Sequence, residues 1–259
     1  MFKGTMKNIY AYRHTVWDMA ISQLKVKYSG SILGFWLAVI NPLLLMLVIS
    51  FVFTTIFKLE MKNFSLFVLS GIFPWMFFSG VLNEAPSCIL SQQGMLRQFN
   101  LPKEIIPLSL VLSNFLNFLI GWAVIYPLFI FFNPAIILLA PLLIAGLLLI
   151  FLFTYGLSLA LAILNVFLRD IGQLLGVLLM FWFWFTPIFY SVDMIPGRFR
   201  WIYAINPMAY YIVYFRDVIF KGVGPGPIII IGVLFWTTAS MVLGLMVFSK
   251  LESKLLKRI

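Results

Sequence analysis

The residues best suited to binding chemistry in this chain are aromatic. The sequence holds 28 Phe, 10 Tyr and 8 Trp, and ring faces can stack on sugar rings through weak, uncharged contacts that tolerate a sliding ligand. The densest run is Phe181-Trp182-Phe183-Trp184-Phe185, followed by Phe189 and Tyr190. Five consecutive helical residues cannot face one way, so only a stripe of the run could line a conduit. The candidate lining residues are Phe181, Trp182, Phe185, Phe189 and Tyr190, with Phe35 and Trp36 earlier in the chain. The alternative is that Trp and Tyr mark a membrane interface while Phe fills packing positions.

Groups for covalent or metal chemistry are scarce. The sequence has no G-x-x-x-x-G-K-[ST] phosphate loop, and prolines interrupt the glycines at 222, 224 and 226. His14 is the only histidine and Cys88 the only cysteine, so a zinc site, a Ser–His pair or an internal disulfide would lack partners. We therefore expect no catalytic residue, no metal and no cofactor in this chain.

The composition predicts an integral membrane protein, so the aromatic residues must be positioned by membrane-spanning helices. Of 259 residues, 63% are hydrophobic and 10% are charged, a ratio that a water-soluble fold cannot bury. The apolar stretches predict an all-α fold with six transmembrane helices at residues 31–57, 64–82, 105–132, 134–168, 171–190 and 227–248. These predicted spans contain no charged residue, which argues against an ion-coupled transporter and against a membrane enzyme.

Residues 201–220 are apolar enough for a seventh span, but they contain Asn206-Pro207, Arg216 and Asp217. Two charges at bilayer depth would cost roughly 5–7 kcal/mol on an insertion scale. We expect an extracytoplasmic re-entrant helical hairpin at residues 191–225 instead. With six spans, twelve of the 18 Lys and Arg residues lie on one side, which predicts that both termini are cytoplasmic.

Two cytoplasmic segments complete a single predicted domain over residues 1–259. In residues 1–30, Trp17, Ile21, Leu24 and Tyr28 recur at helical spacing, which is typical of an amphipathic helix in the headgroup plane; a disordered basic tail is the alternative. Residues 83–104 predict a loop with a short docking helix before Pro102. The net charge of +10 is concentrated at segment ends, as expected for headgroup contact and topology, so we expect no nucleic-acid partner.

Six stretches along the chain form a recognisable series. They are Lys27-Tyr28-Ser29-Gly30-Ser31-Ile32-Leu33-Gly34-Phe35-Trp36 with Asn41-Pro42, Phe73-Pro74-Trp75, Asn100-Leu101-Pro102-Lys103-Glu104-Ile105-Ile106-Pro107, Phe167-Leu168-Arg169-Asp170-Ile171, Thr186-Pro187-Ile188, and Asn206-Pro207 with Arg216. In this order, and over essentially the whole chain, they resemble the permease subunits of polysaccharide-exporting ABC-2 type transporters.

The resemblance implies a homodimer of six-span subunits in the cytoplasmic (inner) membrane that exports a lipid-linked glycan such as O-antigen, teichoic acid or capsule. A separate ABC ATPase beneath each subunit would bind ATP and Mg²⁺, which would account for the missing phosphate loop. The implied ATPase-coupling residues are Trp17, Ile21, Leu24, Arg97 and Gln98, and the implied outer-gate residues are Asn206, Pro207 and Arg216. Two alternatives remain: an ABC-2 type exporter of drugs or lipids, and a membrane-embedded enzyme of envelope glycan synthesis.

Overall fold

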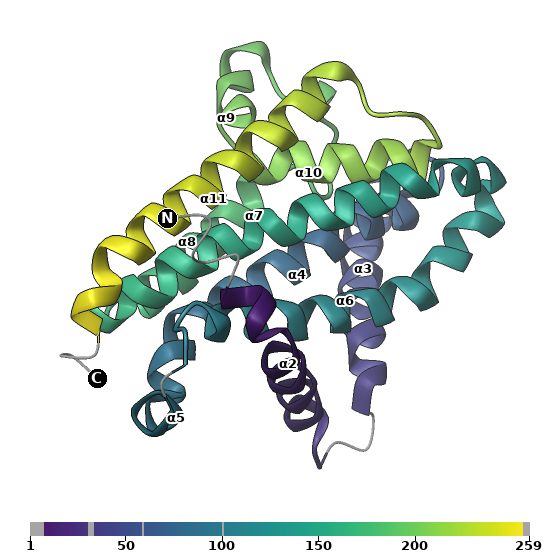
Figure 1. Cartoon of the computed structure of the whole chain (residues 1–259). Helices are drawn as coiled ribbons and strands as arrows, with labels where there is room; N and C mark the ends of the chain where they lie inside the picture. The colour runs from purple at the N-terminus through teal and green to yellow at the C-terminus, as the bar shows by residue number, and fades with distance from the viewer. Residues whose placement is uncertain (1–7, 31–33, 59, 100, 256–259) are drawn as a thin grey trace.

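The computed structural model describes residues 8–30, 34–58, 60–99 and 101–255. Every regular element in these ranges is helical, so the predicted all-α fold is confirmed for this part of the chain. The long helices are α3 (Leu37–Phe51, continued by a π-helical turn, η2, Val52–Ile56), α4 (Phe64–Ser91), α6 (Ile105–Phe132), α7 (Ala140–Phe167) and α11 (Pro227–Leu255) (Figure 1). The shorter helices are α2 (Arg13–Tyr28), α5 (Gln93–Gln98), α8 (Ile171–Phe185), α9 (Arg200–Ala204) and α10 (Pro207–Phe215, continued by a second π-helical turn, η6, Arg216–Lys221). Short 3-10 turns join them: η1 (Gly34–Trp36), η3 (Pro134–Leu139), η4 (Val192–Met194) and η5 (Gly197–Phe199).

Five helices in the described ranges are long and apolar enough to cross a membrane: Val39–Ile56, Phe64–Ser91, Ile105–Phe132, Pro134–Phe167 and Pro227–Leu255. The fifth predicted span is represented by α8, which is apolar but has only 15 residues. At 1.5 Å per residue α8 extends about 22 Å, less than the roughly 30 Å hydrocarbon core. The helix ends at Phe185 because Pro187 disfavours helical geometry at Thr186 and cannot donate a backbone hydrogen bond.

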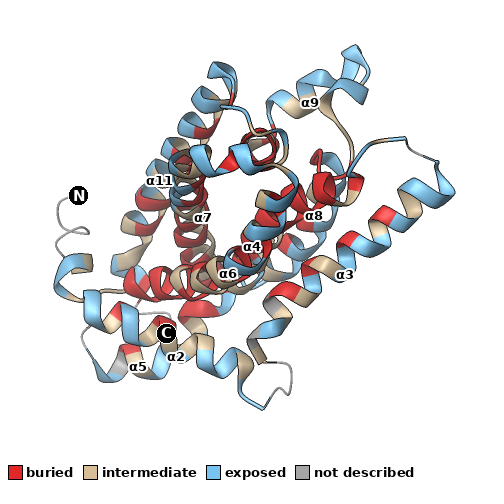
Figure 2. Ribbon diagram, turned by 90° about the vertical axis from the view of Figure 1, so that its right-hand side faces the viewer, coloured by how far each residue is buried: buried red, intermediate tan, exposed pale blue. Residues whose placement is uncertain are grey.

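Helix α4 lies at the centre of the bundle. It contacts α3, α6, α7, α8 and α10, and 78% of its most apolar 18-residue stretch is buried, compared with 33% or less in the other four long helices. Figure 2 shows buried residues concentrated on α4 and α7, whereas α3 lies at the edge and is largely exposed. Protein therefore shelters α4, and the outer helices leave apolar faces for lipid or for another subunit.

The closest helix pair is α7 with α11, which cross at small residues. The Ser240 hydroxyl donates a hydrogen bond of 2.6 Å to the Phe153 carbonyl, and a Cβ atom on Gly244 would overlap the carbonyl of Gly156. Only glycine permits this approach. In lipid, where apolar area gives little driving force between helices, such close backbone contact is a main source of association.

The end of α4 corrects the sequence prediction. The second span was expected to stop at Leu82, but the helix continues to Ser91 because local polar groups satisfy one another. The Asn83 amide donates to the Ser79 carbonyl at 2.8 Å, and the Asn165 amide donates to the Pro86 carbonyl at 2.8 Å. Glu84 therefore lies within a candidate membrane helix, contrary to the expectation that the spans carry no charge.

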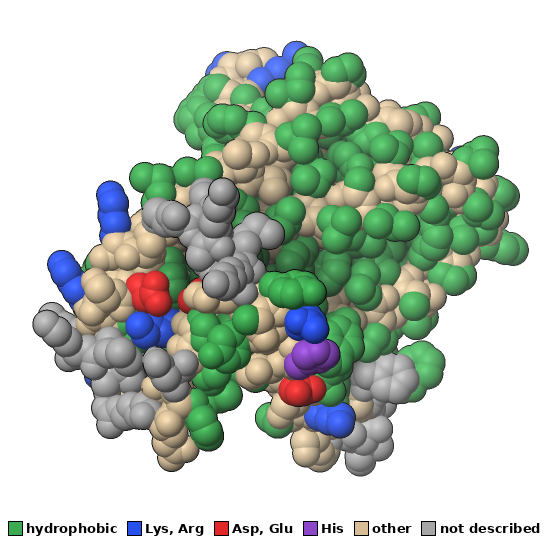
Figure 3. Space-filling model, in the orientation of Figure 1, with side chains coloured by type: hydrophobic (Ala, Val, Ile, Leu, Met, Phe, Trp, Pro, Cys, Tyr) green, Lys and Arg blue, Asp and Glu red, His purple; other side chains and the backbone are tan. Residues whose placement is uncertain are grey.

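The two ends of the bundle differ in character. In both ribbon views α2, α5 and the C-terminal end of α11 lie towards the bottom, and α9 lies at the top (Figures 1 and 2). On the face drawn in Figure 3, hydrophobic side chains cover most of the upper and right-hand part, and charged side chains gather near the bottom over α2 and the end of α11.

Candidate functional site

The aromatic run on α8 divides into an exposed side and a packed side. Phe181 and Phe185 are 56% and 54% exposed, and they belong to a broad apolar face with Leu174, Val177, Leu178, Met180 and Trp184. Trp182 is half-buried and its ring packs against Trp75 and Phe78 of α4, with centroids 6.4 and 5.2 Å away. The predicted lining stripe is therefore split by the fold, since α4 covers one of its members.

The other aromatic candidates also lie in different environments. Phe189 is buried and packs against Phe53 beside α3, with centroids 5.3 Å apart. Tyr190 is half-buried, and its hydroxyl donates to the Trp184 carbonyl at 3.3 Å. Trp36, at the start of α3, is about half exposed. The side chain of Phe35 lies outside the described residues.

Asn206 ties the end of α8 to the start of α10. Its side-chain oxygen accepts a 2.8 Å hydrogen bond from the Trp182 indole. Its amide donates to the Phe185 carbonyl at 3.2 Å and to the Thr186 hydroxyl at 3.0 Å. Pro207 follows as the first residue of α10, where a missing backbone N–H costs nothing. One buried carboxamide thus satisfies the backbone that α8 leaves open where its helix ends.

Arg216 satisfies two further backbone carbonyls in the segment that follows α8. Its side chain is 3% exposed, and its guanidinium donates to the carbonyls of Pro187 and Ile188 at 2.9 and 2.8 Å. The guanidinium also lies 3.6 Å from the ring centre of Phe67 on α4. This buried charge is accommodated because it caps two carbonyls and stacks on a ring.

We use the name "outer knot" for Trp182, Thr186, Asn206 and Arg216 together with the carbonyls they cap. The segment that carries the last two, residues 206–222, runs along the first half of α7. The Tyr211 hydroxyl lies 3.4 Å from the Leu149 carbonyl and 2.6 Å from the Thr237 hydroxyl, and the Tyr214 hydroxyl donates to the Leu142 carbonyl at 2.7 Å. Gly222 then lies against the side chain of Asn133. The three predicted gate residues are therefore brought to one region, at the two ends of a buried helix.

Helix α2 confirms the predicted helix in residues 1–30 but packs on a different face. Val16 and Ala20 are its buried residues, and α2 contacts α6. Trp17 is 50% exposed and Ile21 and Leu24 are partly buried, so the predicted coupling face remains open on the protein surface. Polar contacts also hold this helix, among them those of Lys27 with Glu84 and Asn114 and of Gln23 with Ser109.

The second part of the predicted coupling surface lies beside α2. A groove of about 420 Å³ separates α2 from the start of α5, with Asp18 and Met19 on one wall and Gln92 and Met95 on the other. Gln98, at the end of α5, is exposed. The side chain of Arg97 lies outside the described residues. The structure therefore brings the two predicted coupling segments together, although they are separated by about seventy residues in the sequence.

Comparison with known protein families gives a match over most of these elements. The sequence model of the ABC-2 type transporter family matches residues 15–220. The chain belongs to the ABC-2 type transporter family. The matched range of this ABC-2 chain begins inside α2 and ends inside η6, so it includes the α2 face, α5, α8 and the outer knot.

Three relatives of this ABC-2 transporter chain carry the name O-antigen export system permease protein RfbA. Two O-antigen export system permease proteins RfbA from Klebsiella pneumoniae are each 32% identical over 234 residues, covering 88% of both chains. A protein of the same name from Myxococcus xanthus is 28% identical over 225 residues, covering 83% of this chain and 84% of its own.

Sequence reasoning missed the polar contacts inside the ABC-2 bundle. Lys27, Glu84 and Asn114 form a triangle: Lys27 Nζ donates to Glu84 at 3.1 Å and to Asn114 at 2.9 Å, and Asn114 donates to Glu84 at 2.8 Å. Asn114 and Asn117 are one helical turn apart in an otherwise apolar span. Amides at membrane depth are a signal for a partner or a ligand, and this spacing was available in the sequence.

Proposed function

We propose that this chain is the membrane-spanning subunit of an ATP-driven exporter that moves a lipid-linked polysaccharide across the cytoplasmic membrane. The observation that carries the proposal is the similarity to O-antigen export permeases, at 32% identity over 88% of both chains. The ABC-2 match over residues 15–220 supports it. The chain acts as a transport subunit, and the hydrolysis of ATP belongs to another polypeptide.

The proposed topology has six spans, with α8 as the short fifth span and both termini in the cytoplasm. Residues 191–225 form the outer re-entrant hairpin. The course of residues 206–222 supports this hairpin, because their partners run from Leu149 to Leu142 on α7 and then to Asn133, which precedes η3. Backbone N–H and C=O groups that are not in a regular helix at membrane depth need hydrogen-bond partners from the protein, and the outer knot supplies them.

The proposed assembly is a homodimer with the conduit between the subunits. The interior of one subunit is filled by α4 and its neighbours, which leaves little room for a hydrated glycan within one bundle. The exposed apolar faces of α3 and α8 are the surfaces that a second copy would cover. Phe181 and Phe185 on α8 then line the glycan path or its edge, where ring faces contact sugars without a fixed charge.

The proposed energy source is a separate ABC ATPase that binds ATP and Mg²⁺. Its docking surface is formed by the open face of α2, with Trp17, Ile21 and Leu24, and by α5 with Arg97 and Gln98. The groove between the two helices supports this assignment, because one partner element can contact both walls. Movement of α2 would reach α4 and α6 through the triangle of Lys27, Glu84 and Asn114.

A chromosomal deletion tests the proposed function. Cells that lack this chain are expected to lose nearly all surface polysaccharide and to accumulate the lipid-linked glycan on the cytoplasmic side, because synthesis continues without export. A plasmid copy restores the surface glycan. Normal surface glycan in the deletion strain, together with altered export of a drug or a lipid, would overturn the proposal.

A further inference from the structure

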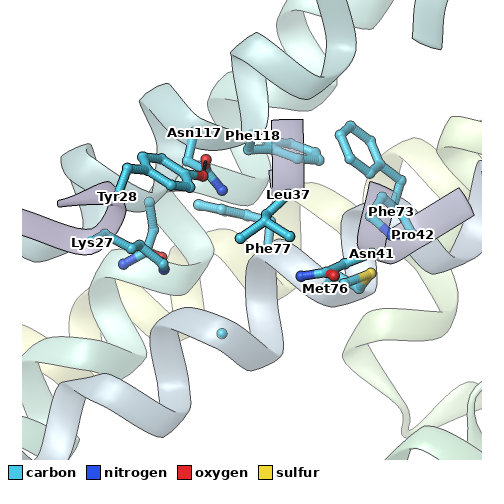
Figure 4. Close-up of a pocket in the computed structure, with 12 residues that line it drawn as sticks. Lys27, Tyr28, Leu37, Asn41, Pro42, Phe73, Met76, Phe77, Asn117 and Phe118 are labelled. Atoms are coloured by element: carbon cyan, nitrogen blue, oxygen red, sulfur yellow. Dashed lines mark hydrogen bonds between the residues drawn. The ribbon is translucent and has the colours of Figure 1, made fainter. Parts of the chain in front are cut away.

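A cavity of about 290 Å³ lies between α2, α3, α4 and α6. Figure 4 shows Lys27 and Tyr28 at one end, with Asn117 beside Tyr28, and Asn41 and Pro42 towards the other end. The wall between them includes Phe73, Phe77 and Phe118. The lining residues come from the four helices just named, so this cavity is distinct from the exposed face of α8 and from the outer knot.

The cavity gathers polar groups that are costly at membrane depth. Asn114 and Asn117 lie roughly 14 and 18 Å from the start of α6 at 1.5 Å per residue. Asn41 lies in the first candidate span, is exposed, and its carboxamide has no hydrogen-bond partner among the described residues. An unpaired amide in an apolar setting costs free energy unless a water or a ligand bonds it. Among the polar groups of the cavity, Asn41 therefore has the greatest need of a polar ligand.

The charges favour an uncharged ligand. The Lys27 ammonium is compensated by Glu84, whose carboxylate lies 3.1 Å from it, so an anion entering beside Lys27 would also meet a negative charge. The Tyr28 hydroxyl already donates to the Asn117 side-chain oxygen, and Asn114 is bonded to Lys27, Glu84 and the Leu110 carbonyl. The groups left for a ligand are the Asn41 carboxamide, the Asn117 amide nitrogen and the Tyr28 oxygen as an acceptor. An amide both donates and accepts, and a hydroxyl does the same, so this set matches a ligand rich in hydroxyl groups.

Size and shape narrow the ligand further. At about 30 Å³ per water, the cavity has the volume of roughly ten waters, which is enough room for one six-membered sugar ring. The three phenylalanines give an apolar wall for the C–H face of such a ring. A second hollow of about 410 Å³ shares Lys27 and Asn114 with the first and is lined by further hydroxyl and amide side chains: Ser22, Gln23, Ser87, Ser91, Gln92 and Ser113. The polar lining thus continues along α2 towards the groove beside α5.

We propose that the cavity between α2, α3, α4 and α6 binds one uncharged sugar ring within a single subunit. This inference rests on the proposed function, which brings sugars to the protein. The ring arrives either as the headgroup of a glycolipid from the bilayer or as a sugar unit from water. Asn41, Asn117 and Tyr28 bond its hydroxyl groups, and the phenylalanine wall contacts its apolar face.

Gly80 provides the test, because it lines the cavity and a Cβ atom there would meet no neighbour within 4 Å. Gly80→Leu therefore fills the cavity without a backbone clash. Gly197→Leu in η5 is the control, since that position is equally open and does not line the cavity. The probe is radiolabelled octyl β-D-glucoside, used below its micelle concentration with the permease–ATPase complex in nanodiscs.

The wild-type complex and Gly197→Leu are expected to bind the glucoside saturably, and Gly80→Leu to bind it at least about tenfold more weakly, a difference of about 1.4 kcal/mol. Asn41→Leu is expected to weaken binding similarly while the unfolding temperature is unchanged, because Asn41 has no hydrogen-bond partner among the described residues to lose. Competition by methyl glucoside would identify a ring taken from water, and competition only by long-chain alkyl glucosides would identify a ring delivered from the bilayer; both support the inference.

Equal binding of the glucoside by Gly80→Leu and the wild type would overturn the inference. Stronger competition by octyl phosphate than by unlabelled octyl glucoside would also overturn it. A wild-type complex that exports glycan but lacks saturable glucoside binding refutes this inference alone, whereas a complex that exports no glycan refutes the proposed function.

Discussion

Replacing Arg216 by alanine is expected to reduce glycan export by at least about tenfold, because the substitution costs several kcal/mol where one or two kcal/mol is already a large fraction of stability. The guanidinium caps the carbonyls of Pro187 and Ile188 and stacks on Phe67. Leaving a buried acceptor without its donor typically costs about 1–3 kcal/mol, and Arg216→Ala leaves the two carbonyls without their donor. The measurements are surface glycan in cells and the unfolding temperature of the purified protein.

Two further variants separate the buried contact from a general effect of positive charge. Arg216→Lys is expected to give an intermediate result, because an ammonium cannot reproduce the planar guanidinium that stacks on the ring while it caps both carbonyls. Arg198→Ala removes an exposed arginine from the same outer segment and is expected to leave export and stability unchanged. Normal export and stability in Arg216→Ala would show that the outer knot does not hold the end of α8.

Trp182 and Phe185 are expected to respond to alanine in different ways, although they are only three residues apart. Trp182→Ala removes packing on Trp75 and Phe78 and leaves the Asn206 oxygen without its donor. We expect a loss of about 3–5 kcal/mol in the free energy of unfolding, as for other large-to-small aromatic changes in a core. Phe185→Ala affects an exposed ring and is expected to change stability by less than about 0.5 kcal/mol.

Export then shows which ring contacts the glycan. If the exposed face of α8 lines the conduit, Phe185→Ala lowers export while the protein stays folded and bound to its ATPase. Leu178→Ala, on the same exposed face, is the control for a loss of apolar area without a ring. Trp182→Phe retains the ring packing but not the indole donor, so its export should lie between those of the wild type and Trp182→Ala. Unchanged export in Phe185→Ala would remove the conduit assignment from this face.

The sequence predicted the class of fold because hydrophobicity and charge are local properties. Long apolar stretches and the charged pair at Arg216 and Asp217 were enough to place most helices and to separate residues 201–220 from the spans, but the predicted fifth span, 171–190, ran past Pro187, whereas α8 ends at Phe185. The boundary of α4 was wrong because its continuation depends on partners from elsewhere. Asn165 caps the Pro86 carbonyl from a helix nearly eighty residues away, and Lys27 compensates Glu84 from α2.

The sequence predicted which segments carry the candidate sites, but not which side of each helix is buried and which is exposed. Periodicity identified Trp17, Ile21 and Leu24 as one side of a helix, yet the buried side carries Val16 and Ala20, because α6 offers small and polar contacts there. In α8 the aromatic run has rings in every direction, so only the position of α4 decides that Trp182 packs inward while Phe185 remains exposed. Tertiary packing supplies this information, and a single sequence does not contain it.

Reconstitution of the chain with and without its ATPase tests the central claim most directly. Sealed vesicles that contain the purified chain alone, a lipid-linked glycan and ATP with Mg²⁺ are expected to accumulate no glycan against a gradient. Addition of the partner ATPase is expected to start accumulation, and a nucleotide that cannot be hydrolysed should not sustain it. Sustained uphill transport by the chain alone would contradict the account, since it assigns the conduit to this polypeptide and the driving force to another.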